Sequence, residues 1–301
     1  MAVRVRPPPA AGAPNMSNLS GHVADITLGL YMQAELWSAR FLVVSESSSP
    51  AFLRHEHRKT TRIALEEAGA QYINYEIDLS NKPEWYITKV NPASKVPAIA
   101  YGGPLTDPDK PSDQSVKLAE SAVLLEFIAD LYPQAGLMPP TPVERAQVRF
   151  FVEFIGCKLL PAFFAFVFKG TVGDPLKNVL EVIQQRLPRN NTFFGGDKPN
   201  IADIAVAPFL ARIQLQLQHD LGAFPEGEGL KLYQELQGEP FHVLKEYMNA
   251  LMARESFKKT FDEVYLVNKL KERLGHLRRA KSVSPPPSQA SGTPPTITAA
   301  S

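Results

Sequence analysis

The chain has little cysteine, little net charge and no long uninterrupted apolar run. Its single cysteine, Cys157, can form neither an internal disulfide nor a thiolate metal cluster, so we expect a reducing compartment, the cytoplasm, and no metal site. With 32 Lys and Arg against 31 Asp and Glu, the formal net charge is +1, which argues against nucleic acid as a partner. The richest apolar stretch, Phe163 to Phe168, ends at Lys169 and is far shorter than the roughly 20 residues that cross a bilayer. We therefore expect no membrane span.

The two ends differ in composition from the middle. Residues 1–21 contain Pro7, Pro8, Pro9 and Pro14 and no acidic group, and residues 282–301 contain five prolines and no charged group. Such segments bury too little apolar area to offset the entropy of ordering. We predict disordered tails at 1–21 and 282–301, the second rich in Pro, Ser and Thr.

The middle divides into two halves of different pattern. From residue 22 to 132 the order is helix, strand, helix, strand, strand, helix, with predicted elements at 61–69, 71–79, 82–86, 95–101, 116–119 and 120–132. Residues 133–142 carry Pro133, Pro139, Pro140 and Pro142 and are predicted to be a linker. From 143 to 281 only helices are indicated, at 143–165, 175–186, 201–219, 229–236, 241–255 and 256–279. An α/β domain followed by an all-helical domain is the predicted organisation.

Four segments carry a resemblance to a known family. Lys82 to Pro97 ends in Ser-Lys-Val-Pro, Leu118 to Val123 contains Glu-Ser, Phe150 to Gly170 is rich in phenylalanine, and Phe194 to Asp203 contains Asn-Ile-Ala-Asp. Together they resemble the cytosolic glutathione transferases, most closely the omega class and its fungal members. The resemblance implies a thioredoxin-like N-terminal domain and an all-α C-terminal domain, with glutathione as co-substrate.

The resemblance also implies a glutathione site, for which the residues have suitable chemistry. A cis Val96-Pro97 peptide would turn the main chain of Val96 outward, where the ligand can pair like an added strand. Glu120 and Ser121 stand where a strand meets a helix, so exposed N–H groups favour a carboxylate while Glu120 binds the ligand's amine. Lys82 and Lys95 could bind the glycine carboxylate, although lysines near the ends of helices and strands are often only solvated.

The residue that activates the thiol is harder to identify. In the omega pattern a Cys-Pro pair precedes the first helix, and this sequence has no such cysteine; residues 37–59 do not resemble the family and look insert-like. In one alternative, Phe41 to Ser45 is the first strand and Ser49 stands beside the thiol at the start of a helix through Leu65. In the other, Asp25 to Tyr31 is the strand and Ser38 or Tyr31 approaches the ligand. We prefer Ser49, which could equally be a helix cap.

Other conspicuous residues have structural explanations. Asn200 and Asp203 form a capping signature whose role is stability. Cys157 is expected to be a small buried residue within a helix. The phenylalanines of the second half should mostly fill the core, with some lining a pocket for hydrophobic electrophiles: Phe150, Phe151, Phe154, Phe163, Phe164, Phe166 and Phe168.

Two functions follow from these features. The first is an enzyme that binds glutathione and transfers it to a small hydrophobic electrophile, or reduces disulfide or glutathione-linked substrates. The resemblance also implies a homodimer and a role in detoxification. The second is a catalytically impaired glutathione-binding or protein-interaction module of the same fold.

Overall fold

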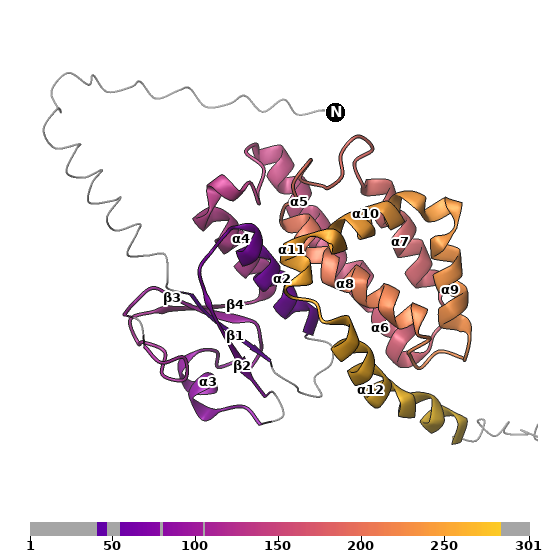
Figure 1. Ribbon diagram of the computed structural model, residues 1–301, viewed down its shortest axis with the longest axis horizontal. Helices are drawn as coiled ribbons and strands as arrows, with labels where there is room; N and C mark the ends of the chain where they lie inside the picture. The colour runs from indigo at the N-terminus through magenta and orange to yellow at the C-terminus, as the bar shows by residue number, and fades with distance from the viewer. Residues whose placement is uncertain (1–40, 47–54, 79–80, 105, 284–301) are drawn as a thin grey trace, which may run out of the picture.

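The computed structural model describes residues 41–46, 55–78, 81–104 and 106–283, which form a small sheet domain packed against a larger helical domain (Figure 1). The sheet domain comprises β1 (Phe41–Glu46), α2 (His55–Glu67), β2 (Ile73–Ile77), α3 (Glu84–Lys89), β3 (Ala98–Tyr101), β4 (Val116–Ala119) and α4 (Ser121–Leu131). The predicted order of elements is thus confirmed from α2 to α4, with ends displaced by a few residues.

The strands form one sheet in the order β2-β1-β3-β4. Strand β1 lies parallel to β2 and antiparallel to β3, and β3 pairs antiparallel with β4. The first of the two alternatives for the first strand is therefore correct, because residues 41–46 lie at the centre of the sheet. Of residues 37–59, which look insert-like in the sequence, 41–46 and 55–59 belong to β1 and α2. That the segment is an insertion stays a prediction. The rival strand from Asp25 lies outside the described residues.

The second domain is helical, as predicted. Its elements are η2 (Pro133–Ala135), α5 (Pro142–Phe154), η3 (Ile155–Leu159), α6 (Leu160–Lys169), α7 (Asp174–Arg186), α8 (Ile201–Gln218), α9 (Glu228–Gln237), η4 (Glu239–Phe241), α10 (His242–Ala253), α11 (Glu255–Lys258) and α12 (Glu263–Val283). Two expected single helices are divided. The first contains the π-helical turn η3 and continues to Lys169, and the last is split between α11 and α12.

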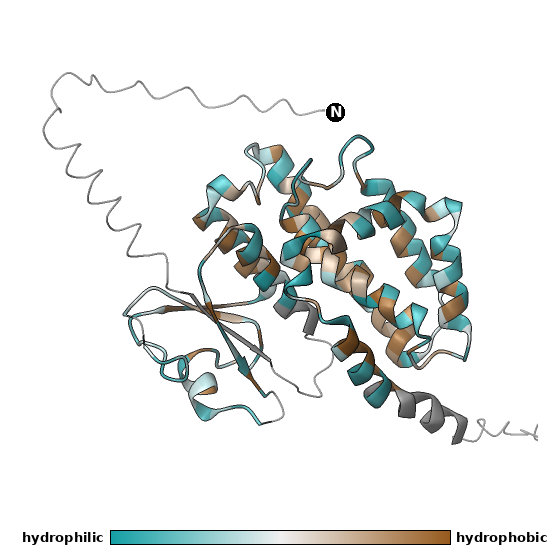
Figure 2. Ribbon diagram, in the orientation of Figure 1, coloured by the Kyte–Doolittle hydropathy of each residue, from teal (hydrophilic) through white to brown (hydrophobic). Residues whose placement is uncertain are grey.

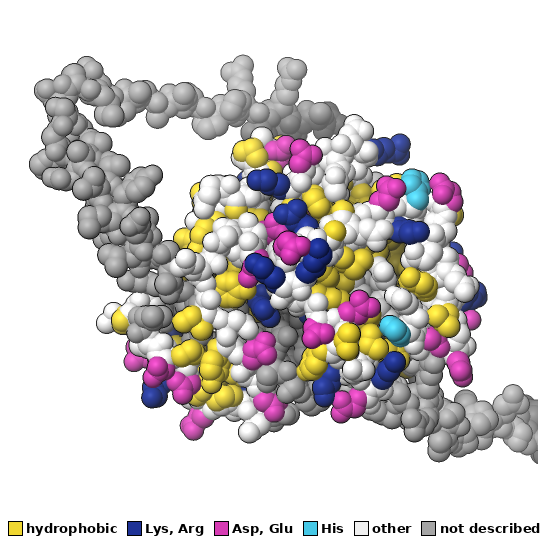
Figure 3. Space-filling view, in the orientation of Figure 1, with side chains coloured by type: hydrophobic (Ala, Val, Ile, Leu, Met, Phe, Trp, Pro, Cys, Tyr) yellow, Lys and Arg dark blue, Asp and Glu magenta, His cyan; other side chains and the backbone are white. Residues whose placement is uncertain are grey.

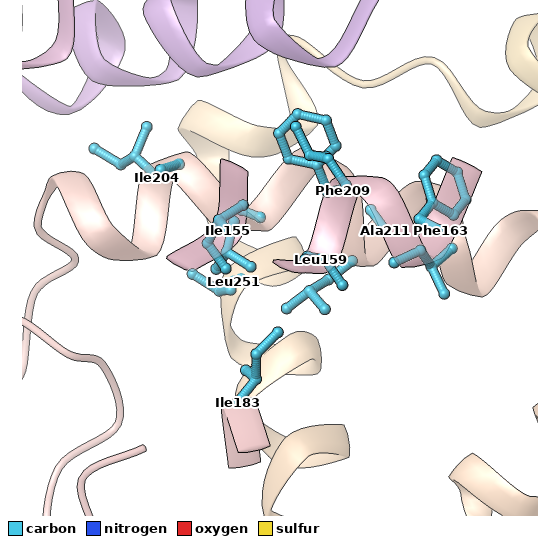
Figure 4. Packing of buried hydrophobic residues seen from close by; sticks show 14 of the residues in the cluster. Ile155, Leu159, Phe163, Ile183, Ile204, Phe209, Ala211 and Leu251 are labelled. Carbon is cyan, nitrogen blue, oxygen red and sulfur yellow. The ribbon is translucent and has the colours of Figure 1, made fainter. Parts of the chain in front are cut away.

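Helix α8 forms the centre of the helical domain. Nearly all of its residues are buried, and its apolar colouring in Figure 2 contrasts with the hydrophilic outer faces of α7, α9 and α10. Side chains of α5, α6, α7 and α10 meet it in one cluster. Figure 4 labels Phe163, Ile183 and Leu251 of these helices and Ile155 of η3, together with Ile204, Phe209 and Ala211 of α8. A helix that is buried on nearly all sides needs neighbours on all sides, and this requirement sets the arrangement of the domain.

The two domains share this core. Ile63 and Leu65 of α2, Ile99 of β3 and Leu124 of α4 belong to the same buried cluster as the helices of the second domain. Helix α2 packs directly against both α4 and α8. The position of α2, which follows the central strand β1, is therefore determined by both domains.

One continuous helical stretch, Pro142–Lys169, is long and apolar enough to cross a membrane by length and composition. The expectation that no stretch would reach this threshold is wrong. Buried side chains of the same stretch, among them Phe151, Phe163 and Phe166, pack in the main core. A core helix passes the same test, so the finding is weak support for membrane insertion. Acidic and basic side chains are interspersed over the face seen in Figure 3, in keeping with the small net charge.

Candidate functional site

The predicted ligand-binding residues lie around the turn that leads into β3. Asn91 organises this turn: its side-chain oxygen accepts a hydrogen bond from the Ala93 N–H at 3.1 Å, and its Nδ2 donates to the Lys95 carbonyl at 2.7 Å. The buried Tyr86 hydroxyl also donates to the Lys95 carbonyl. Burial raises the pKa of Tyr86. The tyrosine therefore remains a neutral donor at physiological pH, and Lys95 is held by two side chains.

The Val96-Pro97 peptide is cis, as the resemblance implied. The Val96 side chain is 5% exposed and packs in a small cluster with Tyr86 and Ala98. Within the described part of the chain, neither the N–H nor the C=O of Val96 has a hydrogen-bond partner. An anchored side chain with an unpaired main chain is the arrangement needed to bind an extended peptide.

Glu120 and Ser121 lie next to this peptide because β3 and β4 are neighbours. The register pairs Ala98 with Ala119, so Pro97 and Glu120 extend from the same end of the two strands. Glu120 has φ 71° and ψ 113°, in the left-handed half of the map that non-glycine residues rarely occupy, and α4 begins at Ser121. The main chain is strained where the strand turns into the helix, and such strain is concentrated at functional sites.

The two predicted lysines have different environments. Lys95 Nζ lies 3.7 Å from Glu120 Oε1, with both side chains more than half exposed. Lys82 Nζ donates to the Ser94 carbonyl at 2.9 Å, so it also braces the turn before Val96. The structure thus brings Lys82, Lys95, Val96, Pro97 and Glu120 together with Ser121. Ser49, Ser38 and Tyr31, the candidates for activating the thiol, lie outside the described residues.

Cys157 is exposed, and the expectation that it would be buried is wrong. It lies in the π-helical turn η3, four residues after the exposed Glu153, and its Sγ donates to Glu153 Oε1 at 2.9 Å. This hydrogen bond, together with partial loss of hydration and the negative charge of Glu153, raises the pKa of Cys157. A raised pKa lowers the thiolate fraction, so Cys157 has the opposite of the environment that activates a nucleophile.

The phenylalanines divide into core and surface residues. Phe151, Phe163 and Phe166 are buried, as expected. Phe150 is 58% exposed, and the Arg186 guanidinium lies 5.0 Å from the centroids of both the Phe150 and Phe154 rings. These two rings therefore form part of an outer surface on α5.

The capping signature at the start of α8 is confirmed and is larger than predicted. Asp203, which is fully buried, accepts hydrogen bonds from the main-chain N–H groups of Phe194, Gly195 and Asn200. Its fourth donor is the Tyr247 hydroxyl at 2.7 Å, which the sequence did not reveal because it lies 44 residues away on α10. Burial raises the pKa of Asp203 despite these donors.

Two further observations concern metal binding and the position of a large cavity. The described residues contain no group of three or more His, Cys, Asp or Glu that could hold a metal ion. A cavity of about 820 Å³ lies between the end of α7, the loop after it and α10, and none of the predicted glutathione residues lines it.

Comparison with known proteins identifies the family. The model of the glutathione S-transferase N-terminal domain matches residues 59–131, and the model of the glutathione S-transferase C-terminal domain matches residues 172–250. Pyrimidodiazepine synthase of Drosophila melanogaster is 30% identical over 201 residues, which cover 64% of this chain and 77% of that protein. Glutathione S-transferase omega-1 of Mus musculus is 27% identical over 180 residues, 58% of this chain and 68% of that protein.

Solved structures are more similar still. Glutathione transferase Omega 1C from Trametes versicolor is 47% identical with a TM-score of 0.74, covering 79% of this chain and 98% of that chain. Omega 2S from the same organism, solved in complex with 2,4-dihydroxybenzophenone, is 38% identical with a TM-score of 0.70, covering 78% and 98%. The chain belongs to the glutathione S-transferase family. Omega-class proteins are among its relatives.

Proposed function

We propose that the protein is a glutathione-dependent transferase or reductase of omega type. One observation carries the proposal. The unpaired main chain of Val96, which follows the turn that Asn91 holds, lies beside the Glu120 carboxylate because β3 pairs with β4. The cysteinyl part of glutathione would pair with Val96, and its charged amino-acid end would lie against Glu120 and the N-terminus of α4.

Within this site, Ser121 and the first N–H groups of α4 would bind the γ-glutamyl carboxylate, and Glu120 its ammonium group. Lys82 would bind the glycine carboxylate from the turn that it braces, and Lys95, beside Glu120, would add positive charge near the γ-glutamyl carboxylate. Ser49 stays our candidate for stabilising the thiolate, which then attacks an electrophile between the domains.

The acceptor class follows from the relatives. Because Omega 2S from Trametes versicolor binds 2,4-dihydroxybenzophenone, we propose small aromatic compounds with a carbonyl group, besides disulfides, as second substrates. Acceptors of this kind would fit a role in detoxification. A single free cysteine, which forms no disulfide, would fit the reducing environment of the cytoplasm.

Glutathione-agarose capture, followed by turnover with chlorodinitrobenzene and hydroxyethyl disulfide, tests the proposal. Capture with turnover of either substrate is expected. Capture without turnover would favour the impaired binding or interaction module, and no capture would contradict both functions.

A homodimer is also proposed, through the surface of α4 and α5. Val123 and Phe150 are 53% and 58% exposed on these two helices, beside the Arg149–Glu126 and Arg145–Asp130 ion pairs that join them. Apolar side chains ringed by charge are typical of subunit interfaces. Light scattering after size-exclusion chromatography should give twice the 33.2 kDa chain mass, and a Phe150→Glu variant should elute as a monomer.

A further inference from the structure

The cavity between the end of α7, the loop after it and the start of α10 is separate from the proposed glutathione site. Its volume of about 820 Å³ is within the range of sites that bind small molecules. Polar side chains from all three segments line it: Gln184 and Gln185 of α7, Asn190, Asn191 and Thr192 of the loop, and His242 and Glu246 of α10. A ligand in this cavity would therefore meet hydrogen-bonding groups from each of its walls.

Hydrogen bonds hold these walls in place. Helices α7 and α10 lie side by side (Figure 1). Gln184 joins them, since its Nε2 donates to the Pro240 carbonyl at 2.7 Å and its Oε1 accepts from the Leu244 N–H at 3.0 Å. The loop is tied to α10 because Asp203 accepts hydrogen bonds both from main-chain N–H groups of the loop and from the Tyr247 hydroxyl. A ligand would therefore bind to a cavity that is already formed, at a small cost in ordering the protein.

Several polar side chains of the lining are free to bind a ligand. Within the described structure, the side chains of Gln185, Asn190, Asn191 and Thr192 make no hydrogen bond to the rest of the protein. All four residues are exposed. Each amide presents two N–H donors and a carbonyl acceptor, and the threonine hydroxyl can both donate and accept. The cavity thus combines donors and acceptors in similar numbers.

The charged and aromatic side chains of the lining narrow the class of ligand. Two basic side chains, Arg189 and His242, are accompanied by two acidic ones, Asp197 and Glu246. The near balance of charge gives no field that would attract a strongly charged ligand. The ring of Tyr247 is not available for stacking on a flat aromatic compound, because the residue is only 4% exposed and its hydroxyl binds Asp203.

We propose that this cavity is a binding site for a neutral saccharide. Every sugar hydroxyl both donates and accepts, so a saccharide carries hydrogen-bonding groups around its whole rim, as polar walls on three sides require. The half-buried Pro188 and Val243 contact the C–H groups of the sugar rings. A hydrophobic compound with one or two polar groups would instead remove water from these amides without replacing its hydrogen bonds.

Titration of the full chain with four trisaccharides tests the proposal by ligand-observed NMR, which detects weak binding. Maltotriose and cellotriose are neutral, trigalacturonic acid is an anion, and the trimer of glucosamine is a cation. We expect a neutral trisaccharide to bind the wild-type protein more tightly than either charged one. Saturating glutathione should leave its Kd unchanged, because none of the proposed glutathione residues lines the cavity.

Substitutions at Asn191 locate the binding. Asn191→Ala removes one free amide and should raise the Kd for the neutral trisaccharide about 3- to 10-fold. Asn191→Trp fills the cavity from the same exposed position and should abolish binding. Asn178→Ala is the matched control, because Asn178 is exposed on α7 and lies outside the lining, and it should leave the Kd unchanged. Circular dichroism verifies that each variant is folded.

Three results would overturn the proposal. The first is that neither neutral trisaccharide binds the wild-type protein. The second is tighter binding of trigalacturonic acid or the glucosamine trimer, which would assign the cavity to a charged ligand. The third is an unchanged Kd in Asn191→Ala and Asn191→Trp, which would place the saccharide elsewhere on the molecule.

Discussion

Arg254 binds Glu67 across the domain boundary through two hydrogen bonds. The guanidinium Nε lies 2.5 Å from Oε1 and Nη2 lies 2.7 Å from Oε2, and the Ser256 hydroxyl also donates to Oε1. Acidic groups are unfavourable in the last turn of a helix, where the dipole is negative. Glu67 in the last turn of α2 is thus stabilised by the other domain.

Replacing Glu67 with Gln should loosen this contact. Because the Glu67 side chain is only 10% exposed and Arg254 would lose its partner, we expect a loss of about 1–3 kcal/mol in the free energy of unfolding. Urea unfolding monitored by circular dichroism measures it. Glu255→Gln, which breaks an exposed pair with Lys258, is the control and should cost less than about 0.5 kcal/mol. Equal costs for both variants would contradict the importance of the interdomain pair.

The neighbouring Glu66 should make stability depend on pH. Burial works against its charge, but hydrogen bonds from Lys259 at 2.9 Å and Tyr72 at 2.8 Å outweigh it, and the pKa of Glu66 is lowered. A carboxyl whose pKa is lower in the folded state stabilises the protein above the unfolded pKa, about 4.3, and this stabilisation is lost as the pH falls through the folded pKa. The Tm difference between wild type and Glu66→Gln should therefore shrink between about pH 6 and pH 3. A difference that stays constant or grows in acid would contradict this.

Asp203, which accepts four hydrogen bonds, should be the position in the helical domain where substitution lowers the free energy of unfolding most. Asp203→Ala leaves three main-chain N–H groups without their acceptor and should cost at least about 3 kcal/mol of unfolding free energy. Tyr247→Phe removes one donor and should cost about 1 kcal/mol. In the double variant the tyrosine substitution should add little, because the two residues share one interaction. Additive losses would show that they act independently.

Glu120 should be needed for the ligand's ammonium group. Glu120→Gln keeps the size of the side chain and removes its charge, so we expect the Kd for glutathione to rise about 10-fold. Calorimetric titration measures it, with Glu126→Gln, a carboxylate of the same helix bound to Arg149, as the control. An unchanged Kd in Glu120→Gln would place the amine elsewhere.

The environment of Cys157 is directly measurable, because it is the chain's single cysteine. Its pKa is raised chiefly by the hydrogen bond to Glu153, so Glu153→Gln should shift the midpoint of iodoacetamide labelling to lower pH. Labelling should leave glutathione binding unchanged, since the thiol lies on η3 in the helical domain. Loss of glutathione binding on labelling would contradict this assignment.

Local patterns in the sequence were enough to predict most elements and the capping box at Asn200 and Asp203, because periodicity, caps and glycine or proline breaks act within a few residues. They also indicated which residues would form the Val96 and Glu120 site. Only the tertiary structure decided that residues 41–46 are the central strand, since pairing with β2 and β3 involves residues far away along the chain. It likewise decided that the Tyr247 hydroxyl is the fourth donor to Asp203, that Cys157 is exposed and that the Gln216 amide is buried without a partner in the described structure. Packing between distant segments determines the surroundings of each of these side chains.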